Sequence, residues 1–373
     1  MSRTFLASSE LIGTIVGAGF LGIPYVVSKS GFTSGLIQLI VIGIVITLTM
    51  LYLGEIIQRT QSSHQLPGYA ERYLGKEGKK LMSFSVSFGI FSAILAYLMA
   101  EGESISHLIF NSSQYSLYCA LGFWLLLSIL LLGGLGTLKK GESIGVILLL
   151  IMTISITVLY SSNIDSSNLA TFSSSHFFAP LGVILFAFLA FTAMPEVRSI
   201  LSGERKKMKR VILISYFTAF TIYVIFTIVV VGYKGLDTPE IATLALGKPF
   251  ILLGMITMFT AYLSLSTSMI DTIHLDYKKP RLFAWSITIL TPVFLYLLFM
   301  IFKQATFTTI LGIGGVISGG LTALLILAMV RRAKQHGDLT PSFSMPSNRI
   351  LLALLALFFI GGVIAEIISI FLR

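Results

Sequence analysis

Long apolar stretches dominate the chain, and short polar segments separate them. A membrane-spanning helix needs about 20 predominantly apolar residues, and eleven stretches of this kind occur along the sequence. They fall at 4–29, 34–57, 80–110, 115–137, 142–161, 177–201, 208–233, 249–275, 281–302, 306–332 and 349–372. The pattern predicts an all-α integral membrane protein with eleven transmembrane helices and no sizeable soluble domain.

The first stretch has a sequence that disfavours a continuous helix. Residues 13–24 contain four glycines and a proline, and in a helix interior glycine costs about 1 kcal/mol and proline about 3 kcal/mol relative to alanine. In lipid, irregular backbone survives only where protein or a water-filled cavity covers its polar groups. We therefore predict two half-helices that meet near mid-membrane. The alternative is that the glycines only allow close helix packing.

The sixth stretch repeats this feature, because Pro195 and Glu196 precede its basic end and proline disrupts the preceding helical turn. Interrupted helices thus open two units of five spans, at 4–161 and 177–332, and the helix at 349–372 lies outside both. An odd number of spans per unit inverts the second unit relative to the first. Paired interruptions at corresponding positions indicate the midplane site of a secondary transporter.

Composition supports this interpretation: 55% of the residues are hydrophobic and only 11% are charged, with a mean hydropathy of +0.92. The net charge is +10, and with the N-terminus inside, 21 of the 26 Lys and Arg residues fall on the inner side. This bias predicts an N-in, C-out orientation, which we expect in the plasma membrane. The basic excess therefore calls for no nucleic-acid partner. The single Cys119 excludes an intramolecular disulfide and a cysteine metal cluster.

Three motifs resemble a known family. They are Gly17 to Tyr25 followed by Ser30-Gly31-Phe32, then Phe186 to Glu196, and a Ser/Thr-rich run from Thr260 to Asp271. The first two resemble the first and sixth helices of the amino acid/auxin permease family, in the amino acid–polyamine–organocation superfamily. The third is similar to the eighth helix of its bacterial relatives, the hydroxy and aromatic amino acid permeases. The resemblance implies a five-plus-five inverted-repeat fold and ion-coupled amino acid uptake. The sequence departs from the family pattern at Ala190, where glycine is usual, and at Phe191, where histidine is common.

An α-amino acid brings a carboxylate and an ammonium group into the membrane, and both need partners there. Free backbone N–H groups at the start of a half-helix suit the carboxylate, and unwound carbonyls near Phe186, Ala187 and Leu189 suit the ammonium. Tyr97 either donates a hydrogen bond from its hydroxyl to the carboxylate or packs between helices. We expect one of Phe186, Phe188 and Phe191 to cover an apolar substrate side chain. The candidate substrate-binding residues are Thr14, Gly17, Ala18, Gly19, Tyr97, Phe186, Ala187, Phe188, Leu189 and Phe191.

Transport against a gradient needs a coupling ion, and the sequence offers Na⁺ or H⁺ with no other cofactor. Carbonyls of Gly13 and Val16 with hydroxyls of Ser264 and Ser268 provide hard oxygen ligands for Na⁺, unless these hydroxyls bond back to their own helix. The resemblance also bears on the ion, because some proton-coupled relatives of this fold place a cation in the equivalent of the fifth helix. Residues 142–161 contain no lysine, which favours Na⁺. Intramembrane carboxylates mark proton relays, and the candidates are Glu10 and either Glu101 or Glu103.

These features predict a symporter that imports neutral, bulky or aromatic L-amino acids by alternating access. The alternative is an amino-acid-sensing receptor subunit of the same fold, similar to spore-germinant receptors, without net transport. A channel fits less well, because channels usually line their pores with symmetric subunits. No metalloprotease, nucleophile-elbow or nucleotide-binding motif occurs, so we expect no enzyme. The expected partners are an amino acid and the lipid bilayer, and the expected assembly is a monomer or weak homodimer.

Overall fold

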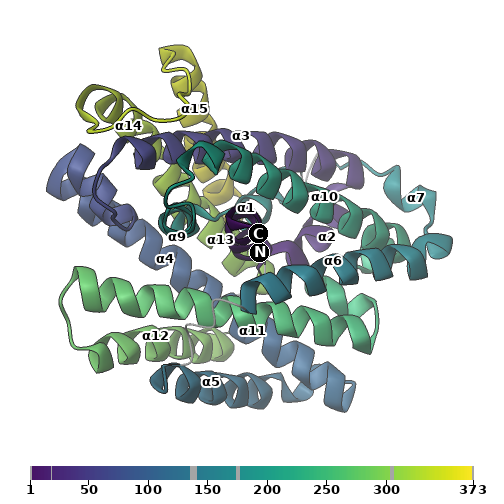
Figure 1. Ribbon diagram of the computed structural model, residues 1–373. Helices are drawn as coiled ribbons and strands as arrows, with labels where there is room; N and C mark the ends of the chain where they lie inside the picture. The colour runs from purple at the N-terminus through teal and green to yellow at the C-terminus, as the bar shows by residue number, and fades with distance from the viewer. Residues whose placement is uncertain (1, 18, 135–140, 174–176, 303–305, 372–373) are drawn as a thin grey trace.

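The computed structural model describes all residues except 1, 18, 135–140, 174–176, 303–305 and 372–373 (Figure 1). The described residues form helices and connecting segments and contain no strand. The α-helices are α1 (Arg3–Ile15), α2 (Gly19–Ser30), α3 (Phe32–Arg59), α4 (Leu66–Phe110), α5 (Ser116–Leu132), α6 (Gly141–Tyr160), α7 (Ser166–Leu169), α8 (Leu181–Ala187), α9 (Met194–Ile200), α10 (Met208–Lys234), α11 (Lys248–Asp271), α12 (Arg281–Phe302), α13 (Phe307–Gly314), α14 (Gly320–His336) and α15 (Arg349–Phe371).

Ten helical segments of the described chain are long and apolar enough to cross a membrane. The count reaches eleven if α1 and α2, which are bent by 50° relative to each other, form one span. The predicted all-helical membrane architecture is confirmed. Figure 1 places α1 in the middle of the bundle, with α3 and α10 on one side and α11 and α12 on the other.

The interruption of the sixth predicted span has a different cause from the one expected. The span is divided into α8 and α9, and the backbone leaves the α-helix at Phe188, several residues before the proline. Pro195 lies in the first turn of α9, where its missing N–H group has no helical partner to lose. Pro24 likewise lies inside α2 and not at the first interruption. Proline therefore does not produce either break.

The tenth predicted span also departs from a regular α-helix. A π-helical segment, Gly315–Gly319, joins α13 to α14. The missing side chain of Gly315 lets α8 approach closely, because a Cβ atom there would lie 2.7 Å from the Phe186 backbone nitrogen. The glycines thus allow this span to pack directly against the interrupted sixth helix.

The first part of α4, residues 66–75, forms a short helix before the membrane-spanning part begins. The chain turns at Gly75, whose φ of +80° favours glycine. Pro67 lies in the first turn of this helix. The segment therefore lies at an angle to the membrane-spanning part of α4.

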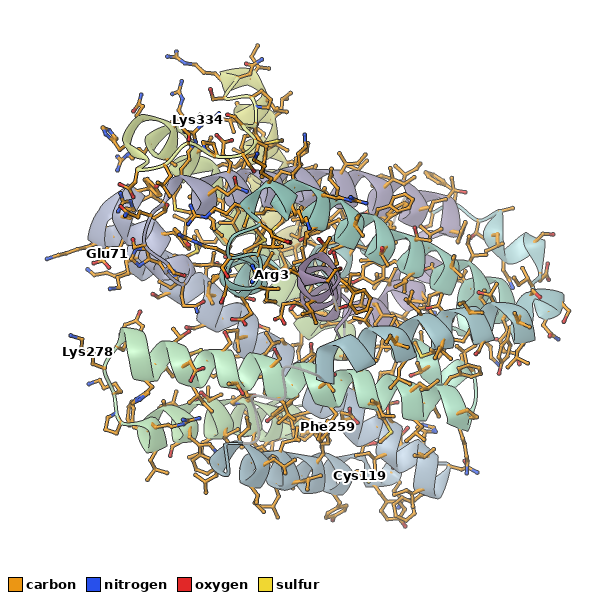
Figure 2. All side chains as sticks on the ribbon, in the orientation of Figure 1. Arg3, Glu71, Cys119, Phe259, Lys278 and Lys334 are labelled. Atoms are coloured by element: carbon orange, nitrogen blue, oxygen red, sulfur yellow. The ribbon has the colours of Figure 1, made fainter. Side chains whose placement is uncertain are left out.

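Ionic contacts tie the ends of several helices together on one side of the bundle. Glu55 of α3 is buried and accepts hydrogen bonds from Arg59 Nε at 2.9 Å, Lys334 Nζ at 3.1 Å and the Met345 backbone at 2.7 Å. Lys334, Glu71 and Lys278 lie on the same side in Figure 2. The α14–α15 connection is thereby fixed against the end of α3.

Asp338 in that connection links it to α4. Its carboxylate accepts hydrogen bonds from the Gln61 backbone at 2.9 Å and from Arg72. The Gln61 bond, with help from the Arg72 charge, holds the pKa of Asp338 below its ordinary value of 3.8.

Because the folded-state pKa of Asp338 is lowered, its stabilising effect is present above the unfolded pKa and is lost as pH falls through the folded pKa. We expect Asp338→Asn to lower the thermal midpoint by about 1–2 °C at pH 7, as is typical of an exposed pair. Melting both proteins from pH 7 to pH 3 tests this. The two midpoints should converge at the acidic end, and a constant difference would contradict the assignment.

Candidate functional site

The two interrupted helices meet at their breaks. The first break separates Ile15, the last residue of α1, from Gly19, the first residue of α2. The second follows Ala187, the last residue of α8. A Cβ atom on Gly19 would lie 2.6 Å from the Cα atom of Ala187. The two backbones therefore touch, and only glycine fits at this contact.

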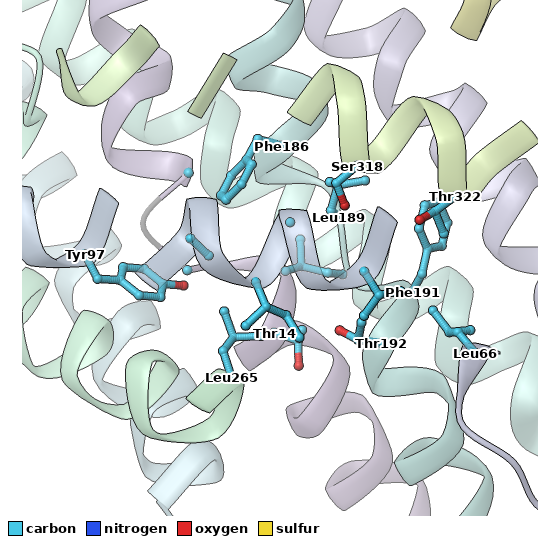
Figure 3. Close-up of a pocket in the computed structure, with 17 residues that line it drawn as sticks. Thr14, Leu66, Tyr97, Phe186, Leu189, Phe191, Thr192, Leu265, Ser318 and Thr322 are labelled. Atoms are coloured by element: carbon cyan, nitrogen blue, oxygen red, sulfur yellow. The ribbon is translucent and has the colours of Figure 1, made fainter. Parts of the chain in front are cut away.

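A cavity of about 620 Å³, counting the part open to solvent, adjoins both breaks. Figure 3 shows Tyr97 at one end of this cavity and Leu66 and Thr322 towards the other. The lining residues come from α1, α2, α4, the α8–α9 region, α11 and the tenth span. They are Thr14, Ile15, Gly17, Gly19, Leu66, Val86, Gly89, Ile90, Ala93, Tyr97, Phe186, Leu189, Phe191, Thr192, Leu265, Ser318 and Thr322.

Most of the predicted substrate-binding residues line this cavity. Those that do are Thr14, Gly17, Gly19, Tyr97, Phe186, Leu189 and Phe191. Ala18 lies outside the described residues. Ala187 and Phe188 are not part of the lining. The cavity wall is mainly apolar, and its polar groups include the hydroxyls of Thr14, Tyr97, Thr192, Ser318 and Thr322.

Phe188 departs from the expectation that it faces the substrate. Its ring is fully buried and packs between two tyrosines of α10, with centroid distances of 6.3 Å to Tyr216 and 5.0 Å to Tyr223. On its far side it contacts α3, where a Cβ atom on Gly43 would lie 3.3 Å from its Cζ atom. The irregular backbone at the break turns this side chain away from the cavity, so Phe188 fixes α8 to α3 and α10.

The carbonyls of the sixth helix are also partly used within the protein. The hydroxyl oxygen of Tyr223 lies 2.7 Å from the Ala187 carbonyl, and the Tyr216 hydroxyl donates to the Phe188 carbonyl at 3.1 Å. These two carbonyls therefore have partners before any substrate binds. Neither tyrosine is among the predicted site residues, although their spacing of seven residues places them on one face of α10.

Tyr97 and Gly17 are in direct contact. A Cβ atom on Gly17 would collide with the Tyr97 hydroxyl, so the missing side chain is what lets this hydroxyl reach the break. Tyr97 is buried and lines both this cavity and a neighbouring one. Its hydroxyl is thereby placed beside the unwound backbone of the first helix.

We expect Gly17→Ala to weaken substrate binding about five- to tenfold. The added methyl group displaces the Tyr97 hydroxyl, which then loses the hydrogen bond that we expect it to donate to the substrate carboxylate. The clash involves the end of a flexible side chain, so the thermal midpoint should change little. Tyr97→Phe should weaken binding by a similar factor. Equilibrium binding to the double variant tests the shared cause, because its loss should be no larger than either single loss. Fully additive losses would contradict it.

A second cavity of about 460 Å³ lies between α1, α6 and α11. The predicted ion ligands Gly13, Val16 and Ser264 line it, together with Thr257 and Thr260. Ser268 does not line it, because it lies one turn further along α11 from Ser264. The Thr257 and Thr260 hydroxyls donate to carbonyls of their own helix, at 2.7 and 2.9 Å.

The predicted proton carriers Glu10, Glu101 and Glu103 line neither cavity. Glu10 is partly buried in α1, and its backbone carbonyl accepts a hydrogen bond from the Thr14 hydroxyl at 3.0 Å. Glu101 is 1% exposed, and neither of its carboxylate oxygens has a hydrogen-bond partner among the described residues. It lies one turn from Tyr97 on α4, which puts it on the face of the helix that carries Tyr97.

Two apposed helix breaks beside an apolar cavity, in an all-helical membrane bundle, are typical of secondary transporters. Residues 1–245 match the tryptophan/tyrosine permease family, and the chain belongs to this family. It is therefore an amino acid transporter-family protein and not an enzyme, and the predicted resemblance to amino acid permeases is confirmed.

Several characterised relatives carry transporter names. Tyrosine-specific transport system 1 of Haemophilus influenzae is 27% identical over 109 residues, which make up 29% of this chain and 27% of that protein. Amino acid transporter AVT1H of Arabidopsis thaliana is 23% identical over 225 residues, covering 57% of this chain and 52% of that protein. Glutamine transporter 2 of Aliivibrio fischeri is 20% identical over 347 residues, or 88% of each chain. The first two matches thus span about a quarter and a half of those proteins.

Proposed function

We propose that this protein is a symporter that imports neutral L-amino acids with bulky or aromatic side chains by alternating access. The observation that carries the proposal is the cavity that adjoins both helix breaks and is lined by residues of each. In this proposal the units 4–161 and 177–332 are inverted repeats within eleven spans, and α15 is an addition. The N-terminus is inside and the protein lies in the plasma membrane.

The substrate lies between the two breaks in this mechanism. Its carboxylate binds near the N-terminal end of α2, where backbone N–H groups and the helix dipole favour an anion, with the Tyr97 hydroxyl as a second donor. Its ammonium group binds carbonyls of the breaks, including that of Leu189. The side chain occupies the apolar part of the cavity beside Phe186 and Phe191, which accounts for the preference for bulky neutral side chains.

The predicted membrane orientation assigns the conformation of the structure to one state of the transport cycle. The cavity extends from Tyr97 towards Leu66 and Thr322, on the side where α3 and α14 end in basic residues. With the positive-inside orientation this side is cytoplasmic. The conformation then corresponds to an inward-facing state of the transporter.

The experiment is uptake into proteoliposomes from a mixture of amino acids, with Na⁺ and pH gradients imposed separately. Competition should be strong with L-phenylalanine, L-leucine or L-tyrosine and weak with L-arginine or L-glutamate, because the described residues that line the cavity include no basic or acidic side chain. Strong competition by arginine or glutamate alone would refute the substrate class. Counterflow separates transport from the sensor alternative, because a receptor without net transport gives none.

If Na⁺ is the coupling ion, Ser264→Ala removes one of its ligand oxygens. We expect this variant to raise the Na⁺ concentration for half-maximal uptake by about three- to tenfold, because part of the coupling free energy is lost with that oxygen. Uptake at saturating Na⁺ should stay near the wild-type level. Ser268→Ala is the matched control, since Ser268 lies outside the second cavity. Initial uptake rates over a Na⁺ series, with choline as the replacement, provide the measurement. Full activity in choline rules out sodium.

A further inference from the structure

Tyr223 of α10 connects the two helix breaks through a single hydroxyl group. Its oxygen lies 2.8 Å from the carbonyl oxygen of Ile15 and 2.7 Å from that of Ala187. Ile15 is the last residue of α1 and Ala187 is the last residue of α8. A side chain from a third helix therefore bridges the C-terminal ends of both half-helices.

The Ile15 carbonyl also accepts a hydrogen bond from the Gly17 backbone N–H, at 3.0 Å. A phenol hydroxyl has one proton, so Tyr223 donates to one of the two carbonyls at a time. The C-terminal ends of helices carry partial negative charge, and here two such ends face the Tyr223 hydroxyl. Tyr223 is fully buried. With the Gly17 N–H on the Ile15 carbonyl and the Tyr223 hydroxyl on the Ala187 carbonyl, each oxygen has one donor. Each keeps a second lone pair, which a substrate ammonium group can use.

Tyr216 provides an internal comparison. It lies two turns earlier on α10, it is 2% exposed, and its hydroxyl donates only to the Phe188 carbonyl, at 3.1 Å. Both tyrosines pack against the Phe188 ring. Both therefore hold α10 against the sixth-helix break, but only Tyr223 also reaches the first helix.

We propose that Tyr223 is a positioning residue of the transport cycle. Its hydroxyl holds the carbonyls of Ile15 and Ala187 at the separation at which a substrate ammonium group binds between them. The residue does not line the cavity and acts through these two carbonyls. This proposal rests on the proposed function, because it requires an amino acid substrate bound between the breaks.

The test compares Tyr223→Phe with Tyr216→Phe in the full-length protein. Each variant removes one hydroxyl group and keeps the ring. Binding and transport of L-tyrosine are measured together with the thermal midpoint of the purified proteins. We expect Tyr223→Phe to raise the Kd and KM about tenfold, as for a lost buried hydrogen bond, with a Vmax within about threefold of wild type. Tyr216→Phe should change the Kd less than about threefold, although its thermal midpoint falls by a similar amount.

The outcomes separate the two proposals. If the wild-type protein neither binds nor transports L-tyrosine or other bulky neutral amino acids, the proposed function itself fails. If the wild type is active and both variants bind with equal affinity, the role of Tyr223 is overturned. Loss of the folded protein in Tyr223→Phe, with Tyr216→Phe intact, would mean that the hydroxyl serves the fold alone and would equally overturn it.

Discussion

Replacing Gly19 by leucine is expected to abolish amino acid binding and uptake. The Cβ atom alone would lie 2.6 Å from the Ala187 Cα atom and 3.0 Å from the Ala187 nitrogen. Backbone cannot turn aside as a side-chain end can, so the two breaks must separate. We expect a loss of affinity of at least about 100-fold, equivalent to about 2.7 kcal/mol. Equilibrium binding and counterflow measure it, with the thermal midpoint as the control for folding.

Gly122→Leu is the matched control for this substitution. Gly122 lies on the exposed side of α5, and no atom of the described residues lies within 4 Å of a Cβ atom placed there. It should bind and transport like the wild type. Unchanged binding in Gly19→Leu would show that the breaks do not form the binding site.

If protons drive transport, Glu101→Gln is expected to remove the response to a pH gradient and to preserve amino acid exchange. Burying an ionised carboxylate in the membrane costs about 2.5 kcal/mol or more, and Glu101 has no partner among the described residues to offset this cost. It should therefore hold a proton in this conformation and release it only where water reaches it. Glutamine mimics the protonated form permanently. Accumulation driven by a pH gradient should fall at least about tenfold, whereas exchange should stay within about threefold.

Glu366→Gln is the control for this prediction. Glu366 is another buried carboxylate in a membrane helix, but it packs against glycines of α8 and α13, away from both cavities. It should leave the gradient response intact. A Glu101→Gln protein that still accumulates substrate on a pH gradient would exclude Glu101 as the proton carrier.

The membrane helices were predictable because hydrophobic length is a local property of the sequence. The stretches at 34–57 and 208–233 lie within the bounds of α3 and α10. The first break was also predictable, because the density of glycines is likewise a local property of the sequence. The second break lies where unwound carbonyls were expected, near Ala187 and Leu189, but its cause was not predictable. Pro195 was expected to interrupt the helix, and it lies in the first turn of α9 instead.

Side-chain direction at the breaks was not predictable. Helical periodicity assigns a side chain to a face only while the backbone stays helical, and that assignment is lost at Phe188. The partners of the break carbonyls come from α10, which is distant in sequence, so the roles of Tyr216 and Tyr223 depend on tertiary packing. The cavity residues Thr192 and Thr322 are ordinary helix residues in sequence and are identified only by where they lie.

The most direct test of the account is counterflow of radiolabelled L-tyrosine in proteoliposomes loaded with unlabelled L-tyrosine. We predict a saturable overshoot for the wild type and for Gly122→Leu, and none for Gly19→Leu. Binding without any overshoot in the wild type would contradict the transporter assignment and favour the sensor. An overshoot that survives in Gly19→Leu would contradict the location of the site between the two breaks.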